Sequence, residues 1–188
     1  MGDQQAVRVL AILGSLRKGS YNRMALEVAR QSLPAGMTLD VADIGAIPLY
    51  NEDVRQQGFP APVEAFRNAI AAADALLFVT PEYNYSMPGV LKNAIDWASR
   101  PPSQPFDGKP VAIMGASMGG FGTARAQYHL RQVCVYLNML PLNRPEVMIP
   151  QAQNKFDAEG RLTDEPTGKF IGELLVALGE WTRRLKAA

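Results

Sequence analysis

Short runs of nearly uninterrupted apolar residues recur along the chain, and each is followed by a polar loop and a segment with helical character. The clearest runs are VRVLAIL at 7–13, ALLFVT at 75–80 and VAIM at 111–114. Such runs are typical of strands buried on both faces, as in a parallel sheet that carries helices on both sides. The alternation therefore predicts an α/β fold, because each parallel crossover needs its own helix.

The same alternation predicts where the strands and helices lie. We expect strands at 7–13, 38–42, 75–80, 111–114 and 146–149, and helices at 23–33, 62–73, 88–97, 123–137 and 167–186. The stretches 43–58 and 151–166 are expected to be loops. Neither an internal repeat nor a linker of different composition interrupts the chain, so we expect a single domain over residues 1–188.

Composition excludes several classes of protein. The 47% hydrophobic and 20% charged residues are ordinary for a globular chain. With 19 Lys and Arg against 18 Asp and Glu, the net charge is +1, which argues against a nucleic-acid partner. The single Cys and single His rule out an intramolecular disulfide and a structural zinc site, so we expect no metal. Without a spanning segment of about 20 apolar residues or a signal-peptide pattern, we expect a cytoplasmic protein that does not insert into membranes.

Three loops at the predicted carboxyl ends of strands carry most of the small, hydroxylated and amide residues: 14–22, 81–86 and 116–120. Ligands of open α/β folds bind at this edge of the sheet. The first loop suits a phosphate, because it combines glycines and serines with Arg17 just before a helix N-terminus. An ordinary capped helix after a tight turn is the alternative.

Two other nucleotide motifs do not fit the first loop. The pattern Gly14-x4-Gly19-Ser20 is close to a P-loop, but the lysine that should follow Gly19 is missing. The G-x-G-x-x-G of a dinucleotide-binding domain is also missing after the first strand. The loop therefore favours a mononucleotide phosphate.

The third loop contains a motif of a different class of enzyme. Gly115 to Gly119 matches G-x-S-x-G, the nucleophile elbow of α/β-hydrolases, with Ser117 as the serine. The only histidine, His129, follows 12 residues later within the next predicted helix. At about 1.5 Å per helical residue it should lie well over 10 Å from Ser117, out of reach for a triad. A Ser117 hydrolase is thus a weak alternative, and we expect His129 to be a surface or interface residue.

The second loop, within TPEYNYSMPG at 80–89, places two tyrosines and an asparagine at a strand end. Flat rings and nearby backbone amides suit a planar heterocycle, and a helix start at Pro88 adds a positive dipole. A well-packed aromatic loop is the alternative, since aromatic residues usually serve packing.

These segments resemble a known family. GSLRKGSYN, TPEYNYSMPGVLKNAIDWASRP and GASMGG are similar to the signature loops of the NAD(P)H-dependent FMN reductases, most of all to their bacterial chromate/quinone reductase branch, also called azoreductases. The similarity covers nearly the whole chain. It implies a flavodoxin-like three-layer sandwich with a five-stranded parallel sheet in the order 2-1-3-4-5, a bound FMN, NADH or NADPH as co-substrate, and a homodimer or homotetramer.

The resemblance also assigns cofactor-binding residues. The FMN phosphate would be held by Ser15, Arg17, Ser20, Tyr21 and Asn22. The isoalloxazine and ribityl chain would lie against Pro81, Glu82, Tyr83, Asn84, Tyr85 and Ser86, largely through backbone groups. Ser117, Met118, Gly119 and Gly120 would complete the site.

The implied chemistry belongs to the cofactor, so no catalytic side chain is expected. Hydride would pass from NAD(P)H to flavin N5, and a quinone, azo compound or chromate would then take two electrons in a ping-pong cycle. A flavodoxin-type electron carrier is the alternative, although carriers usually have a strong field of one sign, unlike this near-neutral chain.

Three further residues are candidates for partner contacts. Arg100, just after the helix at 88–97, is expected near the pocket, where it would attract the phosphates of NAD(P)H; a solvated helix-end cation is the alternative. Arg125, Tyr128 and Gln132 share one face of a predicted helix. Because Arg and Tyr are favoured in interfaces, Arg125 and Tyr128 are candidates for an oligomer contact, with a solvated face as the alternative.

Overall fold

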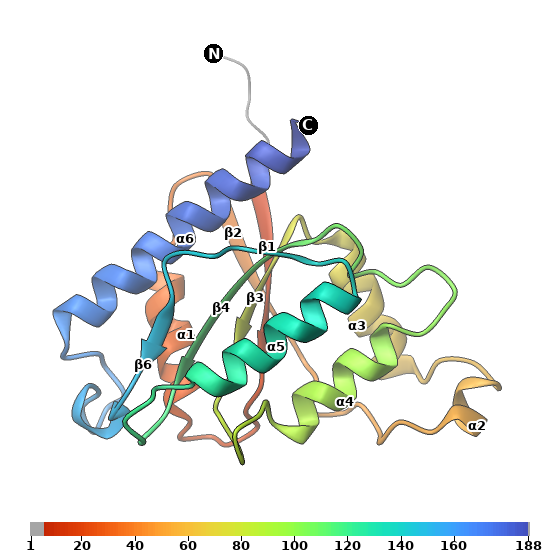
Figure 1. Cartoon of the computed structure of the whole chain (residues 1–188), viewed down its shortest axis with the longest axis horizontal. Coiled ribbons are helices and arrows are strands. Elements are labelled where there is room, and N and C mark those ends of the chain that lie inside the picture. Colours follow the sequence, from red (N-terminus) through yellow and green to blue (C-terminus); the bar gives the residue numbers. More distant parts are fainter. Residues whose placement is uncertain (1–5, 188) are drawn as a thin grey trace.

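Figure 1 shows the computed structural model, which describes residues 6–187. Its six strands form one parallel sheet in the order β2-β1-β3-β4-β5, with β6 also pairing with β4. The strands are β1 (Val7–Leu13), β2 (Met37–Ala42), β3 (Ala75–Val79), β4 (Pro110–Ala116), β5 (Leu140–Pro141) and β6 (Val147–Ile149).

The predicted order is confirmed, with one refinement at the edge next to β4. The predicted fifth strand is β6, which pairs with the second half of β4 through Met114 and Val147. The two-residue β5 pairs with the beginning of β4 and was not predicted. A strand this short, half of it proline, leaves no periodic pattern in the sequence.

Helices cover both faces of the sheet, as the fold class requires. They are α1 (Tyr21–Gln31), α2 (Glu52–Arg55), α3 (Ala61–Ala72), α4 (Gly89–Ala98), α5 (Ala124–Tyr136) and α6 (Glu165–Lys186), with a short 3-10 helix, η1 (Ala152–Asn154). The helices α2 and η1 lie in stretches that were predicted to be loops. No helix among residues 6–187 is long and apolar enough to cross a membrane.

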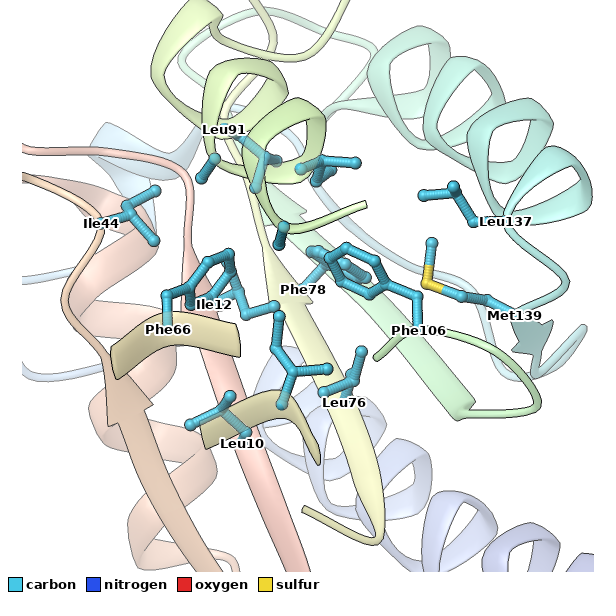
Figure 2. Packing of buried hydrophobic residues seen from close by; sticks show 14 of the residues in the cluster. Leu10, Ile12, Ile44, Phe66, Leu76, Phe78, Leu91, Phe106, Leu137 and Met139 are labelled. Atoms are coloured by element: carbon cyan, nitrogen blue, oxygen red, sulfur yellow. The ribbon is translucent and has the colours of Figure 1, made fainter. Parts of the chain in front are cut away.

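Alternate residues of the central strands contribute their side chains to two separate hydrophobic cores, one on each face of the sheet. Leu10 and Ile12 of β1 face α3, α4 and α5, whereas Val9 and Ala11 face α1 and α6. Figure 2 shows the first core, where Phe78 from β3 and Phe106 pack between sheet and helices. Burial on both faces explains why these strands read as continuous apolar runs.

This arrangement brings together the loops that carry the polar residues. Because β1, β3 and β4 are parallel, the loops that follow them leave the same edge of the sheet, the lower edge in Figure 1. The beginning of β1 and the end of α6 lie at the opposite edge.

Candidate functional site

A cavity of about 350 Å³ lies at the carboxyl ends of β1, β3 and β4, where an α/β sheet normally binds its ligand. It is lined by Ser15, Arg17, Ser20, Tyr21, Asn22, Pro81, Glu82, Tyr83, Ala116, Ser117 and Met118. The structure thus brings residues from all three polar loops together. Of the residues assigned to the cofactor, five do not line the cavity: Asn84, Tyr85, Ser86, Gly119 and Gly120.

The loop after β1 offers a row of donors to this cavity. Among residues 6–187, the backbone N–H groups of 15–19 have no hydrogen-bond acceptor. The loop leads into α1, whose N-cap is Ser20; the Ser20 hydroxyl oxygen accepts from the Asn22 N–H at 3.2 Å. Free N–H groups before a helix N-terminus, with Arg17 beside them, are the donor set that a phosphate requires.

Asn22 lines the cavity and also makes a contact within the protein. Its side-chain amide donates to the Ala116 carbonyl oxygen and accepts from the Ala116 N–H, both at 2.8 Å. The side chain is 2% exposed and pairs with the end of β4 as a neighbouring strand would. The Asn22 side chain therefore fastens the first loop to the third, and its contact with a phosphate stays a prediction.

The loop after β3 is a tight hairpin. Tyr83 and Ser86 exchange two backbone hydrogen bonds of 2.9 Å, and the two residues between them, Asn84 and Tyr85, have φ of 50° and 65°. Asparagine tolerates this left-handed region, whereas tyrosine is strained there. The hairpin leaves Pro81 and Tyr83 on the cavity wall and turns Asn84 and Tyr85 beyond it.

Glu82 lies in the cavity wall, but its carboxylate is directed at α5. One carboxylate oxygen, Oε2, accepts from the backbone N–H groups of Arg125 and Ala126 at 3.0 and 3.1 Å. The other, Oε1, pairs with the Arg125 guanidinium, and the Glu82 side chain is 7% exposed. Only the backbone of Glu82 is thus available to a ligand, as was expected for most of this loop.

The loop after β4 is tied to β6 and η1. The Ser117 N–H donates to the Ile149 carbonyl oxygen, and the Ser117 carbonyl accepts from the Ala152 N–H, both at 3.0 Å. Gly115 precedes this turn, and a Cβ there would stand 2.2 Å from the Thr80 carbonyl oxygen. The first glycine of the G-x-S-x-G pattern is therefore required by close packing against Thr80, which follows β3, and not by a hydrolase mechanism.

The only histidine does not approach the motif serine. His129 is exposed on α5, as expected for a surface residue, and its Nδ1 hydrogen-bonds with the Ser86 hydroxyl at 2.7 Å. The Ser117 hydroxyl oxygen instead accepts from the Gly119 N–H at 3.1 Å. This geometry provides no nucleophile–base pair at Ser117.

Arg100 does not line the cavity. The expectation that it lies near the cofactor site is therefore wrong. It follows the C-terminal end of α4, while the cavity lies near the helix's beginning, and ten helical residues span about 15 Å. Its Nε donates to the Asp96 carbonyl oxygen at 3.0 Å, and it lines a separate groove between α4 and α5.

The residues Arg125, Tyr128 and Gln132, which were expected to share one face of α5, have different surroundings. Tyr128 and Gln132 are exposed, whereas the Arg125 side chain is engaged by Glu82 within the chain. Val135 and Tyr136, which the sequence pattern did not single out, are 78% and 85% exposed at the end of the helix.

The donor set of the cavity fits FMN. The free amides and Arg17 match a phosphate, and the rim carries Tyr83 and Met118, 54% and 60% exposed, against which a flat ring can pack. Among residues 6–187, no three His, Cys, Asp or Glu side chains are placed to hold a metal ion.

Comparisons with known proteins agree with this fit. A family model described as NADPH-dependent FMN reductase matches residues 7–154. The chain is 65% identical over 180 residues to an NAD(P)H-dependent FMN reductase of Pseudomonas aeruginosa, covering 96% of this chain and 97% of that protein. It is 49% identical over 185 residues to a quinone reductase of Escherichia coli, covering 97% and 98%. Among solved structures it is similar to FerB, a flavoenzyme NAD(P)H:(acceptor) oxidoreductase of Paracoccus denitrificans, with a TM-score of 0.86, 36% identity and coverage of 95% and 98%.

Proposed function

Because this chain belongs to the NADPH-dependent FMN reductase family, we propose that it uses NAD(P)H to reduce FMN in the cavity described above and then reduces quinones. Azo compounds and chromate are further acceptors in this proposal. The observation that carries the placement of the cofactor is the row of free N–H groups at 15–19 beside Arg17 and the N-terminus of α1.

The residues divide into three groups in this proposal. The amides of 15–19, with Arg17 and the Ser20 hydroxyl, bind the phosphate. The backbone of 81–83, with Tyr83 and Met118, lies along the ring system. Asn22 and Glu82 hold the walls in place through their contacts with Ala116 and Arg125.

Bound FMN would supply the hydride and two-electron chemistry itself. The chain's own contribution is then binding, orientation and placed donors. The N–H groups of Tyr83 and Ser86 are used within the hairpin, and that of Ser117 is used by Ile149. The Met118 N–H has no acceptor among residues 6–187 and borders the cavity, so it can donate to negative charge that develops on the ring system.

One experiment tests the activity. The purified protein is loaded with FMN, freed of excess cofactor and mixed with NADH or NADPH without oxygen. We expect the visible flavin bands to bleach and then to return on addition of a benzoquinone. Protein that retains no FMN, or flavin that stays oxidised, contradicts the proposal; the second result is what a pure electron carrier would give.

The further acceptors and the kinetic order are tested by initial rates. Donor and acceptor would use the same open side of the cavity in turn, so double-reciprocal plots at several quinone concentrations are expected to be parallel. An azo dye and chromate, offered in place of the quinone, are expected to reoxidise the enzyme. Intersecting lines exclude the ping-pong order, and an acceptor that leaves the bleached enzyme unchanged is removed from the proposal.

We also propose that the chain assembles as a homodimer or homotetramer in the cytoplasm, where NAD(P)H is supplied. Supporting this is the exposed face of α5, where Tyr128, Val135 and Tyr136 present aromatic and apolar surface. Light scattering at micromolar concentration is expected to give at least twice the 20.5 kDa chain mass, and Tyr136→Glu is expected to shift it downward. A monomer at all concentrations contradicts the assembly, and cell fractionation tests the location.

A further inference from the structure

The hairpin that follows β3 is fastened to α5 near both of its ends. At the first end, the Glu82 carboxylate accepts from the Arg125 and Ala126 N–H groups. Those groups belong to the first turn of α5, whose own N-cap residue, Thr123, makes no side-chain capping bond. Glu82 thus caps a helix that begins more than forty positions later in the chain, a separation of 43 and 44 residues for the two bonds.

The second attachment lies one helical turn further along. The Ser86 hydroxyl hydrogen-bonds with His129 Nδ1 at 2.7 Å. Arg125 and His129 are four residues apart and so share a face of α5. Glu82 and Ser86 flank the hairpin turn, which therefore lies along this face.

A strained residue sits between the two attachments. Tyr85 has a φ of 65°, and its ring centre is 3.9 Å from the central carbon of the Arg125 guanidinium. The same guanidinium lies 4.7 Å from the Phe121 ring centre. Strain of this kind persists only where the surroundings enforce it, and it often marks functional positions. Here the surroundings are the two Tyr83–Ser86 backbone bonds of the hairpin and Arg125, which is held between two rings and the Glu82 carboxylate.

We propose that Glu82 is a positioning residue for the cofactor site, acting through Arg125. Pro81 and Tyr83, its immediate neighbours, both line the cavity, while the Glu82 carboxylate faces away toward α5. Any movement of Glu82 is passed directly to these two neighbours. The Glu82–Arg125 pair thereby sets how closely the 81–83 backbone approaches the ring system. This inference rests on the proposed function, since the ring system is that of FMN.

The test measures FMN binding by the apoprotein separately from stability. Glu82→Gln retains the size of the side chain but loses its charge. FMN fluorescence quenching is expected to show affinity weaker by about tenfold or more, because hydrogen bonds to charged groups are among the stronger ones. The absorption bands of FMN bound at saturation are also expected to shift. A change that only weakened the fold would leave the bands of the bound flavin in place.

Asp164→Asn is the matched control. Asp164 caps α6 through the Thr167 N–H and pairs with Lys155, which is the same combination of cap and cation, and it does not line the cavity. This variant is expected to lower the melting temperature of the apoprotein while leaving FMN affinity within about twofold of the unchanged chain. Ser86→Ala is expected to have a smaller effect than Glu82→Gln, because the Ser86–His129 bond is exposed.

A second variant keeps the proposal testable if Glu82→Gln does not fold. Arg125→Lys retains the charge and the backbone cap but loses the planar group between the rings, so a loss of FMN affinity is again expected. Unchanged affinity and unchanged flavin bands in Glu82→Gln overturn the inference. If that variant is unfolded, unchanged affinity in Arg125→Lys does so. An unmodified chain that fails to bind FMN instead refutes the proposed function.

Discussion

Asn22 and Glu82 are polar residues in the cavity wall, yet each directs its side chain at the protein's own backbone. Asn22 satisfies both backbone groups of Ala116, and Glu82 satisfies two N–H groups of α5. Buried donors and acceptors must be paired, and here the pairing partners belong to another loop of the same site. The fixed polar groups of the wall thus leave the free amides of 15–19 as the main ligand donors.

The Asn22 pairing predicts a large stability loss on truncation. Asn22→Ala leaves the Ala116 N–H and carbonyl buried without partners, at about 1–3 kcal/mol for each group. Allowing for relaxation, we expect the free energy of unfolding to fall by about 2–4 kcal/mol in a urea titration of the apoprotein. Asn51→Ala, which removes an exposed cap of α2, is the control and is expected to cost about 1 kcal/mol. Equal losses in the two variants would contradict the role assigned to Asn22.

Cys134 allows a second prediction for a single residue. It is fully buried on α5, and burial raises the pKa of its thiol to about 12. Since the thiolate is the reactive form, we expect the folded protein to resist a disulfide-forming reagent at pH 8. Labelling should become rapid only at the urea concentration that unfolds the chain. Fast labelling without denaturant would show that α5 opens locally.

At the scale of elements, one carboxylate joins three segments at the edge of the sheet opposite the cavity. Asp74, just before β3, accepts from the Arg8 N–H of β1 and from the Lys186 ammonium at the end of α6, both at 2.8 Å. Burial alone would raise the pKa of Asp74, but the hydrogen bonds from Arg8 and Lys186 outweigh it and hold the pKa well below its ordinary value.

This pKa shift predicts how stability depends on pH. A carboxyl whose pKa is lower in the folded state stabilises that state above its unfolded pKa of about 3.9, and the effect is lost as the pH falls below that value. The difference in unfolding free energy between the unchanged chain and Asp74→Asn is therefore expected to be largest near pH 7 and to shrink from pH 4 downward. Glu180→Gln, an exposed change on α6, serves as the control. A difference that stays constant from pH 7 to pH 3 would refute the assignment.

At the scale of the whole molecule, the cavity walls come from loops that three central strands hold in place. A ligand bound there stabilises the folded state by mass action, because the unfolded chain cannot assemble the site. At an FMN concentration of about 100 times Kd, the gain is about 2.7 kcal/mol. For a chain of 188 residues this corresponds to a rise in melting temperature of about 5–10 °C.

Riboflavin provides the matched comparison for this prediction. It carries the same ring system without the phosphate, so it lacks the group that we assign to Arg17 and the amides of 15–19. We expect thermal unfolding curves to shift much less with riboflavin than with FMN at equal concentration. Equal shifts would show that the first loop does not bind the phosphate.

The strands and the edge at which the three polar loops meet are predicted well from the sequence, and the reason is local. Burial on both faces makes β1, β3 and β4 visible as apolar runs, and parallel strands bring the loops after them to one edge. The contacts within the site are not local. Asn22 and Ala116 are 94 residues apart, and whether an asparagine binds a ligand or a strand end depends on what faces it in space.

The other features that the sequence did not predict correctly have similar causes. The helix α2 is four residues long and buries none of them, so it has no periodic apolar face. Arg100 was expected near the cavity because it follows the PEYNYS segment in sequence, but α4 carries it to a separate groove between α4 and α5. Glu82 could have been suspected as a capping residue only if α5, which begins without a capping side chain, had been known to lie beside it.

The contacts of Asp74 with Arg8 and Lys186 also have a practical consequence. Since Arg8 and Lys186 share one carboxylate, the beginning of β1 and the end of α6 lie side by side, on the edge of the sheet away from the cavity (Figure 1). A support, an electrode or a fused protein attached near either of these positions would leave the mouth of the cavity open to solution. The chain is therefore well suited to immobilisation with its active face outward.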